Sequence, residues 1–186
     1  AIGGRGIRGS FAGIIWVGDD RIADMQNKIS LAKRDKWIAR YNSGLAYLKS
    51  QWSQIVNTAN SKNKYAIVFT HGLNDLGNSR GYAQWYHDHI EDIDNWSSRC
   101  FFMSINPTER GKGKNLGNKG NMRSISAFND TMSYVWGARY IDTSRFLTKN
   151  SFNTTDGIHY DDATYRKLYM YVNQLLTGAY GATGTV

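Results

Sequence analysis

Short apolar runs of strand length alternate along this chain with longer segments of helical period. The runs expected to form strands are Ile14–Gly18, Trp37–Tyr41, Tyr65–Thr70, Cys100–Ile105 and Arg139–Ile141. The segments expected to form helices are Arg21–Lys33, Leu45–Ala59, Tyr82–Trp96, Met122–Val135 and Ala163–Leu176. Strands that alternate with helices favour a parallel sheet whose two faces are both covered by helices. The pattern therefore predicts an α/β protein.

The length and composition fit one globular domain. A chain of 186 residues can bury a full core, and neither an internal repeat nor a shift in composition marks a second domain. We therefore predict one domain over residues 1–186, with the glycine-rich ends 1–10 and 178–186 as flexible arms. No apolar run reaches the roughly 18 residues of a membrane span. The lone Cys100 rules out a disulfide framework and leaves the redox compartment open.

The chain carries a formal net charge of +8. Such a charge favours anionic partners, for example nucleic acid, an acidic glycan or a wall polymer. The lysines and arginines are scattered, however, and form no dense block. We therefore expect the charge to serve mainly solubility, and we predict no specific nucleic-acid partner.

Three short blocks place polar groups where a parallel sheet exposes them. Gly18–Arg21 follows the first expected strand, 71–75 follows the third, and 156–160 precedes the last helix. Ligands of open α/β sheets bind at the carboxyl ends of the strands, where helix N-termini also point. These blocks therefore predict a functional site at that edge.

The chemistry of these blocks suits acid–base and oxyanion roles. Asp156 lies three residues before His159, so its carboxylate can orient the imidazole as the supporting half of a nucleophile–base–orienter arrangement. Asn74 follows a strand and a tight turn, and a side-chain amide there can stabilise an oxyanion by about 3 kcal/mol. Each feature alone also fits a plain structural hydrogen bond or an Asn-Asp turn. Their occurrence together favours a catalytic site.

The three blocks together resemble the SGNH (GDSL-like) hydrolase family, whose first block normally reads Gly-Asp-Ser. The likeness extends in the expected order over residues 14 to 177 and includes the stretches 44–48, 104–107 and 140–143. It implies a three-layer αβα sandwich with a five-stranded, mostly parallel sheet of the flavodoxin-like, SGNH hydrolase type. It also implies esterase or deacetylase activity on carbohydrate-linked esters. A secreted or cell-wall-associated location fits the resemblance, and a cytoplasmic one stays open.

The resemblance also assigns roles to single residues. Gly44 and Asn74 are implied as oxyanion-hole donors together with the backbone N–H of residue 20. His159 is the implied base, and Asp156 orients it. The position of the serine nucleophile is taken by Asp20, which has no hydroxyl proton for His159 to remove. A covalent serine ester is therefore excluded for this chain.

Three interpretations of Asp20 remain. The first is a hydrolase whose nucleophile has been replaced, by nature or by engineering. The second is a glycan-active enzyme in which Asp20 acts as a base or as a nucleophile at a sugar carbon, with Asp75 or protonated His159 as the acid. The third is a binding module that has lost the reaction and stacks a glycan on its tryptophans and tyrosines.

Basic side chains near the predicted site are candidate contacts for an anionic substrate. Arg21 follows Asp20, and the glycine-rich segment 109–123 contains Arg110 and Lys112. A long loop after a strand end can act as a flap over a cleft, although many such loops are simply solvated. Arg21, Arg110 and Lys112 are therefore predicted substrate-binding residues.

No motif predicts a cofactor or a metal. The Gly-x-Gly-x-x-Gly of residues 4–9 lacks a preceding strand, and residues 111–117 lack the Gly-Lys-Ser/Thr ending of a phosphate-binding loop. His87 and His89 are two residues apart, so on a helix they point to different sides. We expect a monomer whose partner is a carbohydrate or another small or polymeric ester.

Overall fold

The computed structural model describes residues 9–30, 33–113 and 115–179. Most of the two predicted arms, residues 1–8 and 180–186, lies outside the described residues. The described part of the first arm is held in place, because the Gly9 N–H donates to the Leu175 carbonyl at 2.8 Å. The Phe11 N–H likewise donates to the Leu176 carbonyl at 3.1 Å. Gly9 is thus fixed to the end of the last helix.

The described strands form one parallel sheet with the order β2-β1-β3-β4-β5. Their bounds are β1 Gly13–Gly18, β2 Lys36–Ala39, β3 Tyr65–Phe69, β4 Cys100–Met103 and β5 Tyr140–Ile141. This confirms the predicted α/β class, and all of the pairings are parallel. The strands β1 and β3 lie side by side, with Val17 opposite Phe69. The chain therefore brings the ends of these two strands, and the polar blocks after them, together.

The helices fill the connections between the strands. The α-helices are α1 Asp20–Lys28, α2 Leu45–Ser50, α3 Trp52–Ser61, α4 Ser79–His89, α5 Trp96–Arg99, α6 Met122–Trp136, α7 Thr143–Asn150 and α8 Asp162–Thr177. In the part of the chain that the structure describes, four 3-10 helices cover Leu73–Asn78 (η1), Ile90–Asp92 (η2), Gly117–Gly120 (η3) and Gly137–Arg139 (η4).

One predicted helix was too long and another is interrupted. The helix expected over Arg21–Lys33 ends at Lys28, because Ile29 adopts an extended conformation. The helix expected over Leu45–Ala59 is divided into α2 and α3 at Gln51, whose ψ of 2° breaks the helical path. Both differences arise from local backbone conformations that apolar spacing does not encode.

Two further elements differ from the prediction. The helix expected over Tyr82–Trp96 is divided into α4, η2 and α5, with Asn95 in the left-handed conformation at φ 55°. Helix α7 was not predicted at all. It begins after Asp142, whose carboxylate caps the helix by accepting a hydrogen bond from the Arg145 N–H at 3.0 Å. The apolar pattern of this short segment did not reveal the cap.

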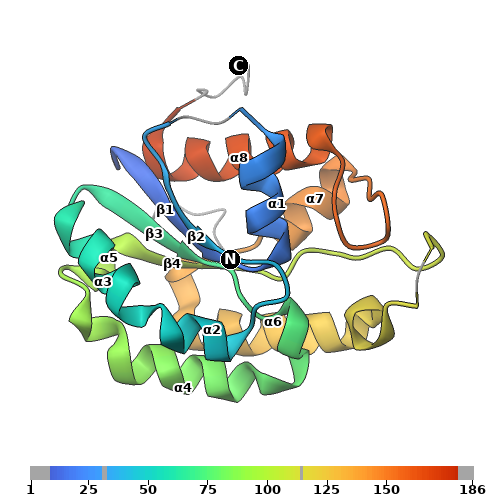
Figure 1. Ribbon diagram of the computed structural model, residues 1–186, viewed down its shortest axis with the longest axis horizontal. Helices are drawn as coiled ribbons and strands as arrows, with labels where there is room; N and C mark the ends of the chain where they lie inside the picture. Colours follow the sequence, from blue (N-terminus) through green and yellow to red (C-terminus); the bar gives the residue numbers. More distant parts are fainter. Residues whose placement is uncertain (1–8, 31–32, 114, 180–186) are drawn as a thin grey trace.

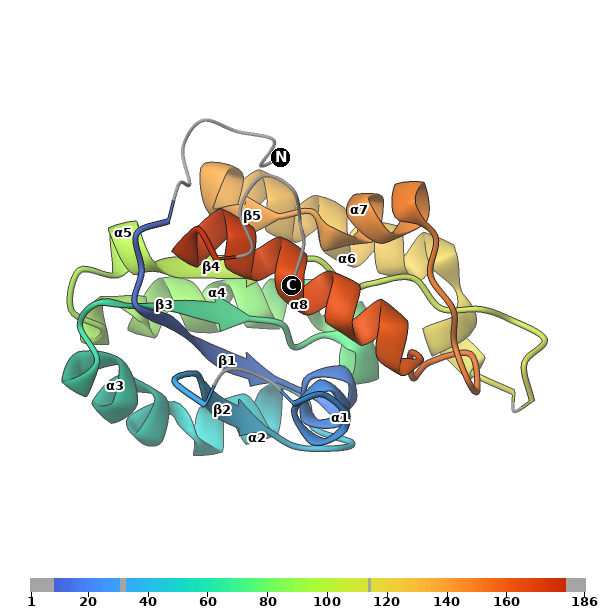
Figure 2. The ribbon, with the colours of Figure 1, turned by 90° about the horizontal axis from the view of Figure 1, so that it is seen from above.

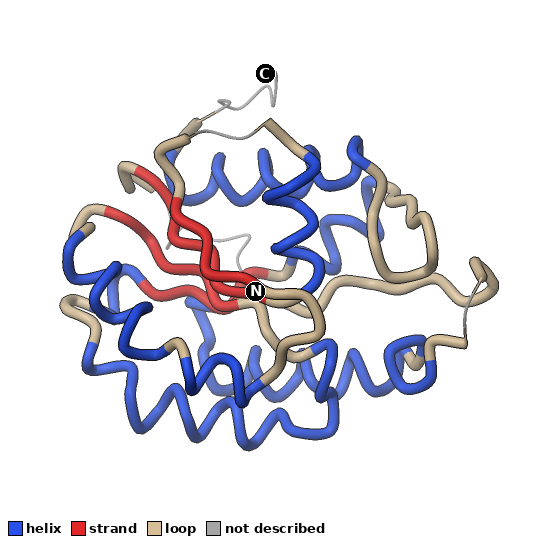
Figure 3. The backbone as a smooth tube through the Cα atoms, viewed as in Figure 1, coloured by secondary structure: helices blue, strands red, loops and turns tan. Residues whose placement is uncertain are grey.

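The molecule has three layers (Figures 1 and 3). Helices α1, α7 and α8 cover one face of the sheet, and α2 to α6 cover the other. Figure 2 shows α8 running roughly along the direction of β1. This arrangement confirms the predicted αβα sandwich.

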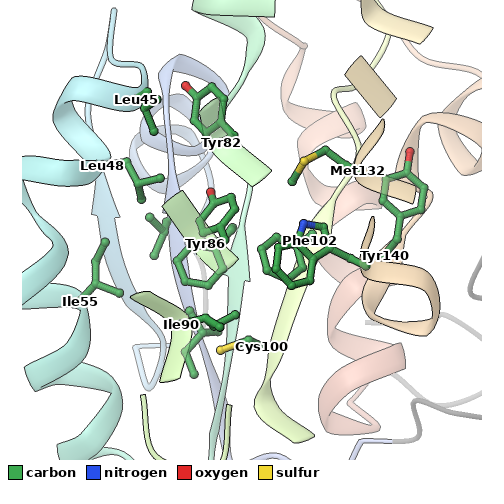
Figure 4. Packing of buried hydrophobic residues seen from close by; sticks show 14 of the residues in the cluster. Leu45, Leu48, Ile55, Tyr82, Tyr86, Ile90, Cys100, Phe102, Met132 and Tyr140 are labelled. Carbon is green, nitrogen blue, oxygen red and sulfur yellow. The ribbon is translucent and has the colours of Figure 1, made fainter. Parts of the chain in front are cut away.

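Each face of the sheet buries its own hydrophobic cluster. Along β1, Ile15 and Val17 join the cluster under α2 to α6, whereas Ile14 and Trp16 join the cluster under α1, α7 and α8. This alternation follows from the two-residue period of a strand. Figure 4 shows part of the first cluster, in which Tyr86 lies close to Phe102. With both faces covered, the strand ends are where a site can open.

Candidate active site

Three loops meet at the carboxyl ends of the central strands. Asp20 begins α1 directly after β1, and Asn74 lies in η1 after β3. Gly72 turns the chain between β3 and η1 with a φ of 148°, and an added Cβ there would lie 2.4 Å from the Phe128 ring. Only glycine fits such a turn without strain. The third loop carries Asp156 and His159 ahead of α8.

The carboxylate of Asp20 is buried and held by two donors. Its Oδ1 atom accepts hydrogen bonds from the backbone N–H of Asn42 and from the side-chain amide of Asn74, both at 2.9 Å. The Asn74 amide also donates to the Ser43 carbonyl at 2.9 Å, which fixes its orientation. Two converging donors on one oxygen form the arrangement that stabilises an oxyanion in acyl transfer. In this chain a carboxylate oxygen fills that position.

His159 and Asp156 form a tight pair on the other side of Asp20. Asp156 Oδ2 lies 2.7 Å from His159 Nδ1, and His159 Nε2 lies 3.9 Å from Asp20 Oδ2. Asp156 Oδ1 also accepts the backbone N–H groups of Ile158 and His159. Burial alone would raise the pKa of Asp156, but these hydrogen bonds outweigh it and lower the pKa to about 2. Asp156 is therefore ionised and orients the imidazole toward residue 20.

Gly44 is not one of the two donors to Asp20 among the described residues, and its implied oxyanion role stays a prediction. Gly44 is the N-cap of α2, and an added Cβ would lie 2.7 Å from Asp75 Oδ2. The backbone donor to Asp20 is Asn42, which adopts a left-handed conformation at φ 55°. Asparagine tolerates that conformation, so the sequence Asn-Ser-Gly after a strand was the signal that could have identified it.

Asp75 is occupied by other partners. Its Oδ2 atom accepts the Leu45 N–H at 3.0 Å, and its Oδ1 atom accepts the Tyr82 hydroxyl at 2.5 Å. Both oxygens are thus used to fix α2 and α4 against the loop after β3. Asp75 is a poor candidate for the acid partner of Asp20.

The guanidinium of Arg21 is used for contacts within the protein, so its predicted role in substrate binding stays a prediction. Arg21 is 5% exposed, and its guanidinium donates to the carbonyls of Asn106, Pro107 and Ile158. It also lies 4.7 Å from the centre of the Tyr160 ring. Arg21 therefore ties the loop after β4 to the loop that carries His159.

Arg110 and Lys112 lie in the loop after β4 and support its structure. Arg110 Nε donates to the Gly120 carbonyl at 2.6 Å. Lys112 Nζ donates to Asn153 Oδ1 at 2.7 Å and to the Thr154 carbonyl at 3.1 Å. Among the described residues, neither forms a hydrogen bond or ion pair with Asp20, Asn74 or His159. Their role in substrate binding stays a prediction.

A buried histidine supports the loop that carries Asn42, and sequence reasoning gave it no role. His71 Nε2 lies 3.0 Å from Ser43 Oγ, and that hydroxyl donates to the Arg40 carbonyl at 2.7 Å. Because the hydroxyl proton is used, His71 is assigned as the donor. Burial lowers the pKa of His71 to about 3, against the opposing charge of Asp20. His71 is therefore neutral.

No helix within the described residues is long and apolar enough to cross a membrane. The same part of the chain holds no group of three or more His, Cys, Asp or Glu side chains placed to bind a metal.

No protein-family model and no curated protein matches this sequence. Solved structures match it well. A lipase/acylhydrolase from Enterococcus faecalis superposes with a TM-score of 0.64 at 13% identity, covering 89% of this chain and 95% of that one. A GDSL-like lipase from Bacteroides thetaiotaomicron gives a TM-score of 0.65 at 11% identity, covering 87% and 86%.

A third similar structure is the C-terminal catalytic domain of a peptidoglycan O-acetyltransferase from Streptococcus pneumoniae. It gives a TM-score of 0.55 at 15% identity and covers 94% of this chain and 96% of that domain. Likenesses at such low identity concern the fold. The chain has the fold of the GDSL-type, or SGNH, hydrolases.

Proposed function

We propose that this chain carries an acyl-ester hydrolase site of the SGNH type, in which Asp20 stands in place of the nucleophilic serine. The observation that carries the proposal is the position of the Asp20 carboxylate. One oxygen receives the two donors Asn42 and Asn74, and the other faces the His159–Asp156 pair. An acyl-transfer site requires both features, a base beside the nucleophile and donors for the oxyanion that forms from the ester carbonyl.

A serine at position 20 would complete the mechanism. Its hydroxyl would give its proton to His159 Nε2 and attack the ester carbonyl, while Asp156 stabilises the resulting imidazolium. The oxyanion of the tetrahedral intermediate would then accept the hydrogen bonds that Asp20 Oδ1 now accepts. As the ester C–O bond breaks, His159 would return its proton to the leaving alcohol, and water activated by the same histidine would release the acid from the acyl-serine. Asp20 itself has no such proton, and its attack on an ester would leave a reactive anhydride. The chain with Asp20 is therefore expected to lack serine-type turnover.

We further propose that the site takes esters carried on carbohydrates. Two features support this substrate class. One structural neighbour is the catalytic domain of a peptidoglycan O-acetyltransferase, and this chain has a formal net charge of +8 that suits acidic polymers.

The decisive experiment is Asp20→Ser, assayed on a panel of acetylated sugars and simple acetyl esters. We expect hydrolysis to appear, and His159→Ala in the same background should abolish it. Asn74→Ala should lower kcat by a factor of about 100 to 1,000, since one oxyanion donor is lost. The matched control is Asp20→Asn, which keeps the shape but supplies no nucleophile.

Two other results would replace the proposal. Cleavage of a glycan by the unaltered chain, lost in Asp20→Asn, would make Asp20 a working base or nucleophile. Since Asp75 is occupied, protonated His159 would then have to be the acid. Glycan binding that survives Asp20→Asn, with no turnover by any variant, would indicate a binding module.

A further inference from the structure

An exposed aromatic ring stands beside the imidazole of the candidate site. Among the described residues, the large hydrophobic side chains left exposed are Tyr41, Met122, Tyr134 and Val135. Of these, Tyr41 has its ring centre 6.3 Å from that of His159, at an angle of 45°. It is 41% exposed and directly precedes Asn42, the backbone donor to Asp20.

The Tyr41 ring is anchored by a buried carboxylate. Its hydroxyl donates to Asp24 Oδ1 at 3.0 Å, and Asp24 is 6% exposed on α1. Asp24 Oδ2 in turn accepts the Tyr165 hydroxyl of α8 at 2.7 Å. The tyrosine is therefore fixed at its far end by two helices while part of its ring stays open to solvent. A side chain that is fixed before binding loses little rotamer entropy when a ligand covers it.

We propose that Tyr41 is the platform on which a sugar ring of the substrate stacks, with the ester directed toward residue 20 and His159. The inference rests on the proposed function for its substrate class. One face of a pyranose presents C–H groups, which suit the electron-rich face of an aromatic ring, while the sugar hydroxyls remain in water. A simple alkyl ester has no such face, so the platform selects esters carried on a sugar.

A second role for Tyr41 predicts a different kinetic result. Tyr41 can also shield the His159–Asp20 pair from water, and in that case its loss would change the pH profile of every substrate equally. A platform acts on binding of the sugar alone. The two roles separate when KM and the pH profile are compared for sugar and alkyl esters.

The first test measures binding to the unaltered chain by calorimetry, with xylotetraose and the tetramer of N-acetylglucosamine as probes. We expect at least one tetramer to bind, and Tyr41→Ala to weaken its binding about tenfold, as loss of an aromatic contact does. Tyr41→Phe keeps the ring but loses the hydroxyl bond to Asp24, and it should retain most of the affinity. Tyr134→Ala is the matched control, because Tyr134 is 90% exposed and lies on α6.

The second test uses the Asp20→Ser background, with an acetylated xylotetraose and ethyl acetate as substrates. Tyr41→Ala should raise KM for the sugar ester about tenfold and leave kcat and the ethyl acetate reaction unchanged. Equal losses on both substrates, or a shifted pH profile, would overturn the platform in favour of shielding. The platform would also be overturned if Tyr41→Ala changed neither tetramer binding nor KM, or if the unaltered chain bound neither tetramer.

The two proposals can fail separately. If Asp20→Ser hydrolyses nothing but the unaltered chain binds a tetramer through Tyr41, the platform stands and the esterase proposal falls. If Asp20→Ser hydrolyses acetylated sugars with no dependence on Tyr41, the esterase proposal stands and the platform falls.

Discussion

The buried polar side chains at the amino end of the sheet differ in their hydrogen bonding from those at the carboxyl end. At the amino end, before β2, Asp35 Oδ1 accepts the Ile14 N–H at 3.1 Å, and its Oδ2 accepts the Trp16 indole N–H at 3.1 Å. Arg99, before β4, donates to four backbone carbonyls, those of Tyr65, Asp94, Ala59 and Lys62. Every one of these contacts holds elements of the fold together.

At the carboxyl end, buried polar atoms are left without hydrogen bonds. Asp19 Oδ2 and His71 Nδ1 have no hydrogen-bond partner among the described residues, and the other two such buried atoms are the indole nitrogens of Trp85 in α4 and Trp136 in α6. Asp19 also lines a cavity of about 10 Å³, enough for about one water molecule. Asp19 and His71 are ionisable and have perturbed pKa values, and buried ionisable groups of this kind are common at functional sites. We therefore expect Asp35 and Arg99 at the amino end to matter mainly for stability, and the Asp20 carboxylate at the carboxyl end to matter mainly for function.

The largest expected effect is a difference in stability between variants of two aspartates, Asp35 at the amino end and Asp20 at the carboxyl end. Asp35→Ala removes the acceptor of three buried donors, the Ile14 N–H, the Trp16 indole N–H and the Tyr169 hydroxyl, and should lower the free energy of unfolding by about 3–5 kcal/mol. Asp20→Asn keeps an oxygen for Asn42 and Asn74 and removes a charge that raises the pKa of Asp19. It should change stability by less than about 1 kcal/mol. Chemical denaturation measures both, and equal losses would contradict this expectation.

The second effect is a pH dependence of stability with two opposing parts. Burial, with the nearby charge of Asp20, raises the pKa of Asp19 from 3.8 to about 7. The native state thus holds this proton more tightly than the unfolded state, and the associated stability is lost as pH rises from about 4 to about 7. Burial lowers the pKa of His71 from 6.5 to about 3, so the native state binds this proton less tightly than the unfolded state does. The stability that comes from the neutral imidazole is therefore lost as pH falls from about 6.5 to about 3.

Asp19→Asn should remove the contribution of Asp19 to the pH dependence of stability and leave the contribution of His71. Asparagine can still accept the Arg21 N–H that caps α1. The variant should therefore lose stability on acidification below about pH 6.5 more steeply than the unaltered chain, by on the order of 3 kcal/mol over the window. His71→Gln should show the opposite slope. Unfolding curves between pH 4 and 7.5 that run parallel for all three proteins would exclude both assignments.

The difference between the two ends also explains what the sequence could predict. The apolar runs predicted all five strands, but the expected strands over Trp37–Tyr41, Tyr65–Thr70 and Cys100–Ile105 ran one or two residues too far. In each case the chain leaves the sheet there to form the loops of the site. Apolar spacing reports burial in the core and carries no information about where a loop begins.

The site was predictable where its contacts are local. Asp156 and His159 are three residues apart, and the structure pairs them at 2.7 Å. The meeting of Asp20, Asn74 and His159 was also predicted, from the positions of their blocks at strand ends, but other distant contacts gave no signal. Arg21 binds carbonyls 85 and 137 residues away, and the N–H of Asn42 reaches Asp20 only because the backbone turns left-handed. Charge and proximity to a motif suggested a substrate contact for Arg21, whereas tertiary packing makes it a tie between loops.

The smallest expected effect concerns the surface charges at the two ends. Arg110 and Arg123 are exposed in the segment after β4, whereas Lys112 is tied to Glu109 at 3.5 Å and to the loop that carries His159. If the carboxyl end binds an acidic polysaccharide, Arg110→Gln with Arg123→Gln should weaken binding of polygalacturonate about two- to fivefold and flatten its salt dependence. The matched control is Lys36→Gln with Lys64→Gln, an equal charge change at exposed positions by the amino ends of β2 and β3. If both pairs weaken binding equally, the attraction comes from net charge alone, and if neither does, the loop is a solvated spacer.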